Sequence, residues 1–197
     1  MNTQKLKTPA IAAAFVVMGL VSGSAMSAVI CNTPPAGTAL PIAVPQTTAG
    51  IYINFVTGAF GTAGATPGWD FNPWGSTAFN FFWSIAAGNT TVGMLTGGVH
   101  AVSAFGDPIG PGQTWSGAGT PTPAAMAPWR AGVTDGYIGI RFRNEVTAVD
   151  NYGWARLTTT GPNGIPATVT AFCYQDDGTQ IFAGSTVPVG LQNFSIE

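Results

Sequence analysis

Charged side chains are scarce in this chain of 197 residues: they make up 7% of it, against about 25% in an average soluble domain. The net charge of −2 at pH 7 offers no basic surface of the kind that nucleic acid requires. Disordered chains combine high charge with few aromatic residues, whereas this chain has 6 Trp, 4 Tyr and 12 Phe. Its 27 glycines and 15 prolines follow no G-X-Y period, which excludes collagen. We therefore expect an all-β, loop-rich extracellular domain with no nucleic-acid partner.

Lysine occurs only as Lys5 and Lys7, and an apolar run over residues 10–21 follows the pair. Small residues then continue to Ala28, which completes the pattern of a secretory signal. The apolar run is shorter than the ~20 residues that a membrane-spanning helix needs. We predict that residues 1–28 are a cleaved signal peptide, with cleavage after Ala25 as the alternative.

The remaining chain shows no sharp change in composition and no second apolar stretch of membrane length. We expect residues 29–197 to form a single domain, in which residues 29–50 are an extended N-terminal arm. The expected location is secreted, extracellular or at the cell surface, with the periplasm as the alternative. No membrane contact is expected after removal of the signal.

Histidine occurs once, as His100, and no G-x-S-x-G elbow surrounds a serine, so a nucleophile–base set has little support. We expect His100 to be a surface or half-buried residue on a strand. A hydrolase with a carboxylate pair is an alternative, with candidates Asp70, Asp107, Asp135, Glu145, Asp150, Asp176 and Asp177. We expect no enzyme, no catalytic residue, no metal and no cofactor. Calcium is the alternative here, because Asp70 with Asn72, or Asp150 with Asn151, offers oxygen ligands.

Two cysteines, Cys31 and Cys173, lie in the part that would be exported. Because exported chains meet an oxidising compartment, we expect them to form one disulfide. Two free buried thiols are the alternative, and a bond between two copies of the chain is left open.

Alternation of apolar and polar residues marks several strands, of which Tyr137–Arg143 is the clearest: Ile138, Ile140 and Phe142 share one face. Glycine, proline and asparagine punctuate the chain between strands, and no helix of ten residues is expected. The pattern predicts an antiparallel β-sandwich or jelly roll of eight to nine short strands. The further strands include 78–86, 99–105, 152–159, 167–174, 180–183 and 187–194, with a long proline-rich loop over 107–128.

Tryptophans are concentrated in and beside the predicted loops. Exposed tryptophans on loops stack on sugar rings or anchor partners, and packing at the ends of the core is the alternative. The candidate contact residues for a ligand or partner are Trp69, Asp70, Trp74, Trp115 and Trp129. Trp83 and Trp154 lie within strands and are expected in the core.

The N-terminal arm carries almost no charge, and few charges hold copies of the domain apart. Such an arm can add as a strand to the open sheet edge of a neighbour. The candidate self-assembly residues are Val29, Ile30, Leu40, Ile42 and Val44. A disulfide to Cys173 within one chain would oppose this, because it holds the start of the arm in its own domain.

The C-terminal third contains Gly136-Tyr137-Ile138-Gly139-Ile140-Arg141-Phe142, then Asn151-Tyr152-Gly153-Trp154, and finally Ala171-Phe172-Cys173-Tyr174 with Ile181-Phe182-Ala183-Gly184. This series resembles the β-sandwich ectodomains of PEP-CTERM-type exported bacterial surface proteins over roughly residues 99–184. The resemblance implies a sandwich fold and a place in envelope or extracellular-matrix material. Two features depart from that family: the cysteine at position 173, and final residues without the Pro-Glu-Pro sorting motif. We expect free secretion or periplasmic residence rather than anchoring by that route.

Together these patterns predict a secreted, non-enzymatic structural or adhesive protein of the cell envelope or extracellular matrix, in which β-strand addition could build fibres. The expected partners are the protein itself or a polysaccharide. The alternatives are a carbohydrate-binding module that uses the loop tryptophans, and a carboxylate-based hydrolase.

Overall fold

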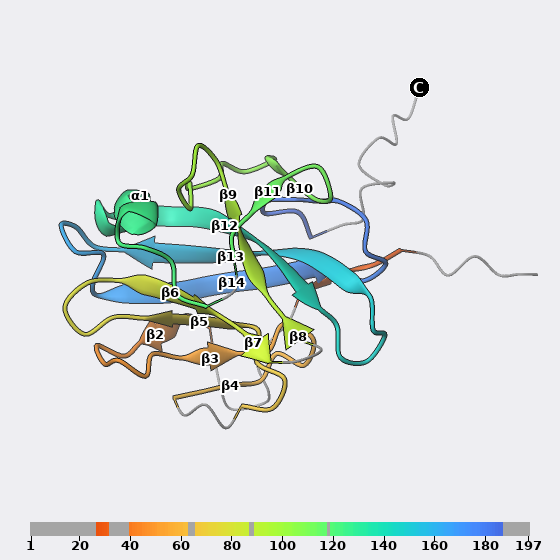
Figure 1. The fold of residues 1–197 in the computed structure, drawn as a ribbon, viewed down its shortest axis with the longest axis horizontal. Helices are drawn as coiled ribbons and strands as arrows, with labels where there is room; N and C mark the ends of the chain where they lie inside the picture. The colour runs from red at the N-terminus through yellow and green to blue at the C-terminus, as the bar shows by residue number, and fades with distance from the viewer. Residues whose placement is uncertain (1–26, 32–39, 63–65, 87–88, 118, 187–197) are drawn as a thin grey trace, which may run out of the picture.

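A seven-stranded antiparallel sheet forms the larger half of the computed structural model, which describes residues 27–31, 40–62, 66–86, 89–117 and 119–186. Strand β14 has two partners on one edge, β1 towards its C-terminal end and β2 towards its N-terminal end. From that edge the sheet runs β1(Val29–Cys31), β14(Ala167–Gln175), β13(Asp150–Thr159), β12(Val133–Arg143), β9(Val92–Leu95) and β11(Thr114–Trp115), and β2(Ile42–Val44) pairs with the other end of β14. Figure 1 shows the long strands β12, β13 and β14 side by side through the middle of the molecule.

A smaller antiparallel sheet packs against the large one. Its strand order is β4(Phe60–Gly61), β3(Tyr52–Ile53), β5(Phe71–Trp74) and β6(Asn80–Trp83). Two further pairs are β7(Ile85–Ala86) with β8(Asn89–Thr90), and β10(Pro108–Ile109) with β15(Ile181–Phe182). A 3₁₀ turn, η1(Ala124–Met126), leads into the four-residue helix α1(Ala127–Arg130). Within the described residues, no helix has the length and apolar character to span a membrane.

The main core lies between the two sheets, as the alternation predicts. Ile138, Ile140 and Phe142 of β12 are fully buried in it. Phe55, which follows β3, packs its ring 5.4 Å from Phe142 and 5.2 Å from Phe172 of β14. Residues from both sheets thus form one cluster, and the fold is the all-β sandwich that the sequence predicts.

A second apolar cluster covers the other face of the large sheet. Tyr152 and Trp154 of β13 point to this side, because neighbouring residues on a strand alternate between faces. The β10–β15 pair supplies Ile109 and Ile181, both fully buried, which pack over them. The β10–β15 pair therefore covers part of the outer face of the large sheet.

The disulfide between Cys31 and Cys173 is present, as predicted. It joins directly opposite residues of β1 and β14. Both strands of the arm pair with β14 of the same chain. The expectation that the arm adds to a neighbour stays a prediction. The five proposed arm residues pack in their own domain: Val29, Ile30, Leu40, Ile42 and Val44.

Two local predictions were wrong. Residues 99–105 form isolated bridges rather than a strand. The expected loop 107–128 contains β10, β11 and η1, because short segments there find partners far along the chain. Strand β15 lies within the expected strand 180–183 and pairs with β10. The expected strand 187–194 lies outside the described residues.

Candidate functional site

Aromatic side chains gather on the outward face of the small sheet. Within β5, Phe71 is buried in the core while Trp74, three positions on, points to the opposite face and is partly exposed. In the same way Tyr52 points away from the core next to buried Ile53, and Phe82 does so next to buried Phe81. Alternation alone therefore places these rings on one side of the sheet.

Trp69 lies against this group and joins it from the loop before β5. Its ring centroid is 4.9 Å from that of Tyr52, with an edge-on angle of 81°, and 5.3 Å from that of Phe82. The indole N–H of Trp74 donates to the carbonyl of Phe81 at 3.3 Å, which fixes the orientation of that ring. We call these four residues, Tyr52, Trp69, Trp74 and Phe82, the aromatic surface.

A shallow hollow of about 170 Å³ opens on the aromatic surface. Three of the four rings line it, and the other lining residues are Thr48, Asn72 and Thr120. Asn72 is held in place because its amide nitrogen donates to the carbonyl of Ala49 at 2.8 Å. None of the lining residues is charged, so the hollow is suited to a neutral ligand.

The turn before β3 brings the backbone close to this hollow. Gly50 has a positive φ of 61°, a conformation that favours glycine. A Cβ atom at this position would collide with the Pro73 carbonyl and with Cβ of Trp74. Glycine at position 50 therefore allows the chain just before β3 to lie close to β5 at Pro73 and Trp74.

Of the five predicted contact residues, Trp69 and Trp74 lie together on one surface, and their contact with a ligand or partner stays a prediction. Tyr52 and Phe82 were missed as site residues, although the period of two that marks each strand also places them opposite the core. Trp115 lies elsewhere, on the outer face of the large sheet, where its ring packs 5.6 Å from that of Tyr152.

The prediction was wrong for Trp129 and Asp70, because both are fully buried. Trp129 follows the proline-rich segment on helix α1, which turns its ring inward to lie 5.5 Å from Phe81. The carboxylate of Asp70 accepts the backbone N–H of Phe55 at 2.8 Å and the hydroxyl of Thr91 at 3.5 Å. It fastens two loops of the sandwich and is not open to a ligand.

His100 is also buried, in contrast to the expected surface or half-buried place. Its ring packs against the rings of Phe81 and Trp83, with centroid distances of 5.8 and 5.4 Å. Nδ1 donates to the carbonyl of Met94 at 3.1 Å, so the other nitrogen carries no proton in the neutral ring. Burial lowers the pKa of His100, and the hydrogen bond to Met94 opposes that shift.

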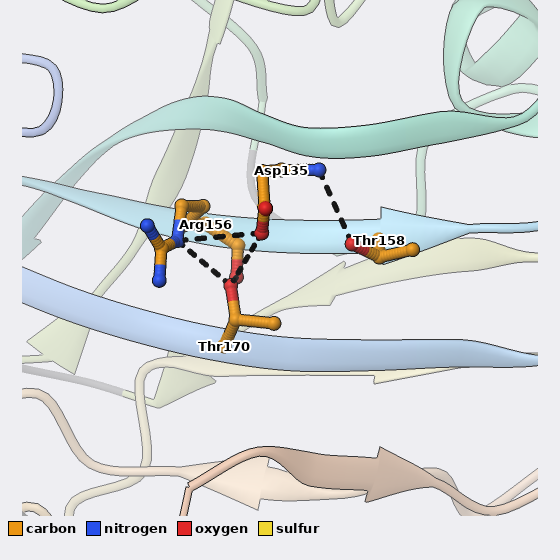
Figure 2. A network of polar contacts seen from close by, with 4 residues as sticks. All are labelled: Asp135, Arg156, Thr158 and Thr170. Atoms are coloured by element: carbon orange, nitrogen blue, oxygen red, sulfur yellow. Dashed lines mark hydrogen bonds and ion pairs between the residues drawn. The ribbon is translucent and has the colours of Figure 1, made fainter.

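Most charged side chains on the outer face of the large sheet are paired. Figure 2 shows Arg156 between Asp135 and Thr170, with Nε 3.5 Å from the carboxylate and 2.9 Å from the hydroxyl. Asp135 lies at a bulge in β12 with φ of 51°, where its N–H is held by the hydroxyl of Thr158. This polar network therefore holds the bulge of β12 in place.

Within the described part of the chain, no three His, Cys, Asp or Glu side chains gather as a metal site would require. The calcium alternative stays a prediction. No family model, curated protein or solved structure matches the chain. The resemblance to exported surface proteins therefore also stays a prediction.

Proposed function

We propose that the protein is an exported, non-enzymatic adhesive protein that binds a neutral polysaccharide at the aromatic surface. The observation that supports this proposal is the gathering of two tryptophans, a tyrosine and a phenylalanine on one surface, where three of the four rings line an uncharged hollow. Aromatic faces pack against the C–H faces of sugar rings, and neutral polar groups bind their hydroxyls. The hollow offers both kinds of contact.

The geometry favours an extended ligand over an enclosed small molecule. The hollow is shallow, and it lies on a sheet whose aromatic side chains come from β3, β5, β6 and the loop before β5. A surface of this kind leaves the ends of a polymer free to continue past it. Repeated weak contacts along one chain then give useful retention, because linked binding events reinforce one another.

Fibre formation through the N-terminal arm has less support. Strands β1 and β2 occupy one edge of β14, and the disulfide fastens β1 there. Donating either strand to a neighbour would require that edge to open first. The proposal therefore rests on adhesion to matrix or envelope polysaccharide and not on strand exchange.

A pull-down with insoluble cellulose, chitin and starch tests the proposal. We expect wild-type protein to be retained by at least one of the three polymers. Trp74→Ala and Trp69→Ala should each weaken that retention about tenfold, since one such stacking contact contributes about 0.5–1.5 kcal/mol beyond its buried area. Near-UV circular dichroism of each variant reports whether its fold is kept, and Trp74→Phe should retain part of the affinity.

Phe105→Ala is the matched control, because Phe105 is an aromatic residue that is 75% exposed and lies outside the aromatic surface. It should bind as wild type does. Absence of binding to all three polymers, or equal binding by folded Trp74→Ala and wild type, would overturn the proposal.

A further inference from the structure

Two arginines lie two positions apart on β12 and point to the outer face of the large sheet. Arg141 and Arg143 alternate with Ile140 and Phe142, which are buried on the inner side. The guanidinium of Arg141 lies over the ring of Trp115, 5.6 Å from its centroid. Tyr152 lies opposite Arg141 in the register of β12 and β13, and its ring also packs against that of Trp115.

Arg141 differs from the other described arginines in having no polar partner. Arg143 is paired with Asp150 at 3.2 Å, and Arg156 with Asp135 at 3.5 Å. Arg130 donates to the carbonyl of Phe79 at 2.9 Å. Among the described residues, Arg141 makes neither a hydrogen bond nor an ion pair, and only the Trp115 ring holds it. Its N–H donors are therefore free for a ligand.

These side chains border a polar hollow of about 190 Å³, lined by Thr90, Arg141, Arg143 and Asp150. We call it the arginine hollow. Two cations against one carboxylate leave a local excess of one positive charge, which matches a single negative charge on a ligand. Thr90 adds a hydroxyl beside them.

We propose that the arginine hollow binds the carboxylate of a uronic acid in an acidic polysaccharide. The planar guanidinium of Arg141 presents paired N–H donors that match the two oxygens of a carboxylate. Trp115, whose ring packs against that of Tyr152, holds the guanidinium in place before the ligand arrives, which reduces the ordering cost of binding. The site is independent of the aromatic surface, which has no charged lining residue.

Titration calorimetry with a polygalacturonate oligomer, at low ionic strength, tests this proposal on the exported form of the protein. We expect Arg141→Gln to weaken binding about tenfold. Arg156→Gln is the matched control: it removes the same charge from the same sheet face, but its arginine is already paired with Asp135. That variant should bind within about twofold of wild type.

Asp150→Asn gives an opposite and independent expectation. It removes the one carboxylate that lines the hollow and frees Arg143, so binding should become several-fold tighter. The methyl ester of the same oligomer, which has no charge, should not bind, and a sulfated dextran should bind more weakly than the uronate.

Several results would overturn the proposal: no binding of the acidic oligomer, equal losses in Arg141→Gln and Arg156→Gln, weaker binding by Asp150→Asn, or binding of the ester or the sulfated polymer as tight as that of the acid. Equal losses would mean that charge alone attracts the polymer. The cellulose, chitin and starch pull-down is a separate readout, and Arg141→Gln should leave it unchanged.

Discussion

At the scale of single residues, His100 shows how a polar side chain becomes part of the core. The aromatic rings of Phe81 and Trp83 pack against it, and Gly93 passes so close that a Cβ there would lie 2.8 Å from its Cε1. One ring nitrogen is satisfied by Met94, whereas Nε2 has no hydrogen-bond partner among the residues that the structure describes. A proton on Nε2 would place a charge among apolar rings without an acceptor.

The stability of the protein should therefore fall as the pH drops below about 6.5. The unfolded imidazole titrates near 6.5, whereas burial lowers the pKa of His100 in the folded state. Between those two values the unfolded chain binds a proton that the folded chain does not, so the stabilisation is complete above pH 6.5 and decreases in acid. Urea unfolding at pH 7.5, 6.5 and 5.5 measures this, with a slope of at most about 1.4 kcal/mol per pH unit.

His100→Asn is the control for that slope, because its amide can still donate to the carbonyl of Met94 but does not titrate. Its overall stability should be lower, since the smaller side chain leaves space beside Trp83. The free energy of unfolding should nevertheless change less between pH 7.5 and 5.5 than in wild type. An identical slope in both proteins would assign the pH dependence to another group.

At the scale of elements, the sequence predicts the long strands that place one face in the main core. Strands β12, β13 and β14 are of this kind, because each has one face in the main core. The short strands β10 and β11 are different: they lie in a segment rich in proline and glycine and are defined only by distant partners. Local pattern carries no information on such partners, and the same holds for β15, whose partner is β10.

The same limit explains the aromatic candidates. The sequence around a tryptophan in a predicted loop looks the same whether its ring points outward, as at Trp74, or inward, as at Trp129. Helix α1 turns the ring of Trp129 inward, but a helix of four residues is too short to show a hydrophobic period in the sequence. Tyr52 and Phe82 were within reach of the sequence, since strand alternation places them opposite buried neighbours.

The disulfide should stabilise the edge of the large sheet as well as the whole fold. It closes a separation of 142 residues, and chain-entropy arguments give loops of this size a contribution of up to about 5 kcal/mol. The double variant Cys31→Ala with Cys173→Ala should lose about 2–5 kcal/mol in urea unfolding. Release of β1 should also uncover the end of β14, so that light scattering detects more self-association than in wild type.

Reductant separates this effect from the substitutions themselves. It should destabilise the wild-type protein and leave the double variant unchanged. If the double variant unfolds at the same urea concentration as oxidised wild type, the bond does not constrain the fold, and the packing of Ile30 and Val29 alone holds β1 in place.

At the scale of the whole molecule, the two proposed sites lie on outward faces that point away from each other. The aromatic surface belongs to the small sheet, and the arginine hollow to the outer face of the large one. Since the main core lies between the inner faces of the two sheets, each outer face looks to its own side. Because the chain carries few charges, no strong long-range electrostatic field should keep a polymer away from either site.

This arrangement predicts that one molecule can join a neutral polymer to an acidic one. Wild-type protein bound to whichever neutral polysaccharide retains it should carry fluorescently labelled polygalacturonate into the pellet. Trp74→Ala should abolish the pelleting of label because the protein itself stays in solution. Arg141→Gln should still pellet as protein but leave the label behind. If the label pellets equally with Arg141→Gln, the acidic polymer binds elsewhere; if either polymer displaces the other, the two sites are not independent and the bridge does not form.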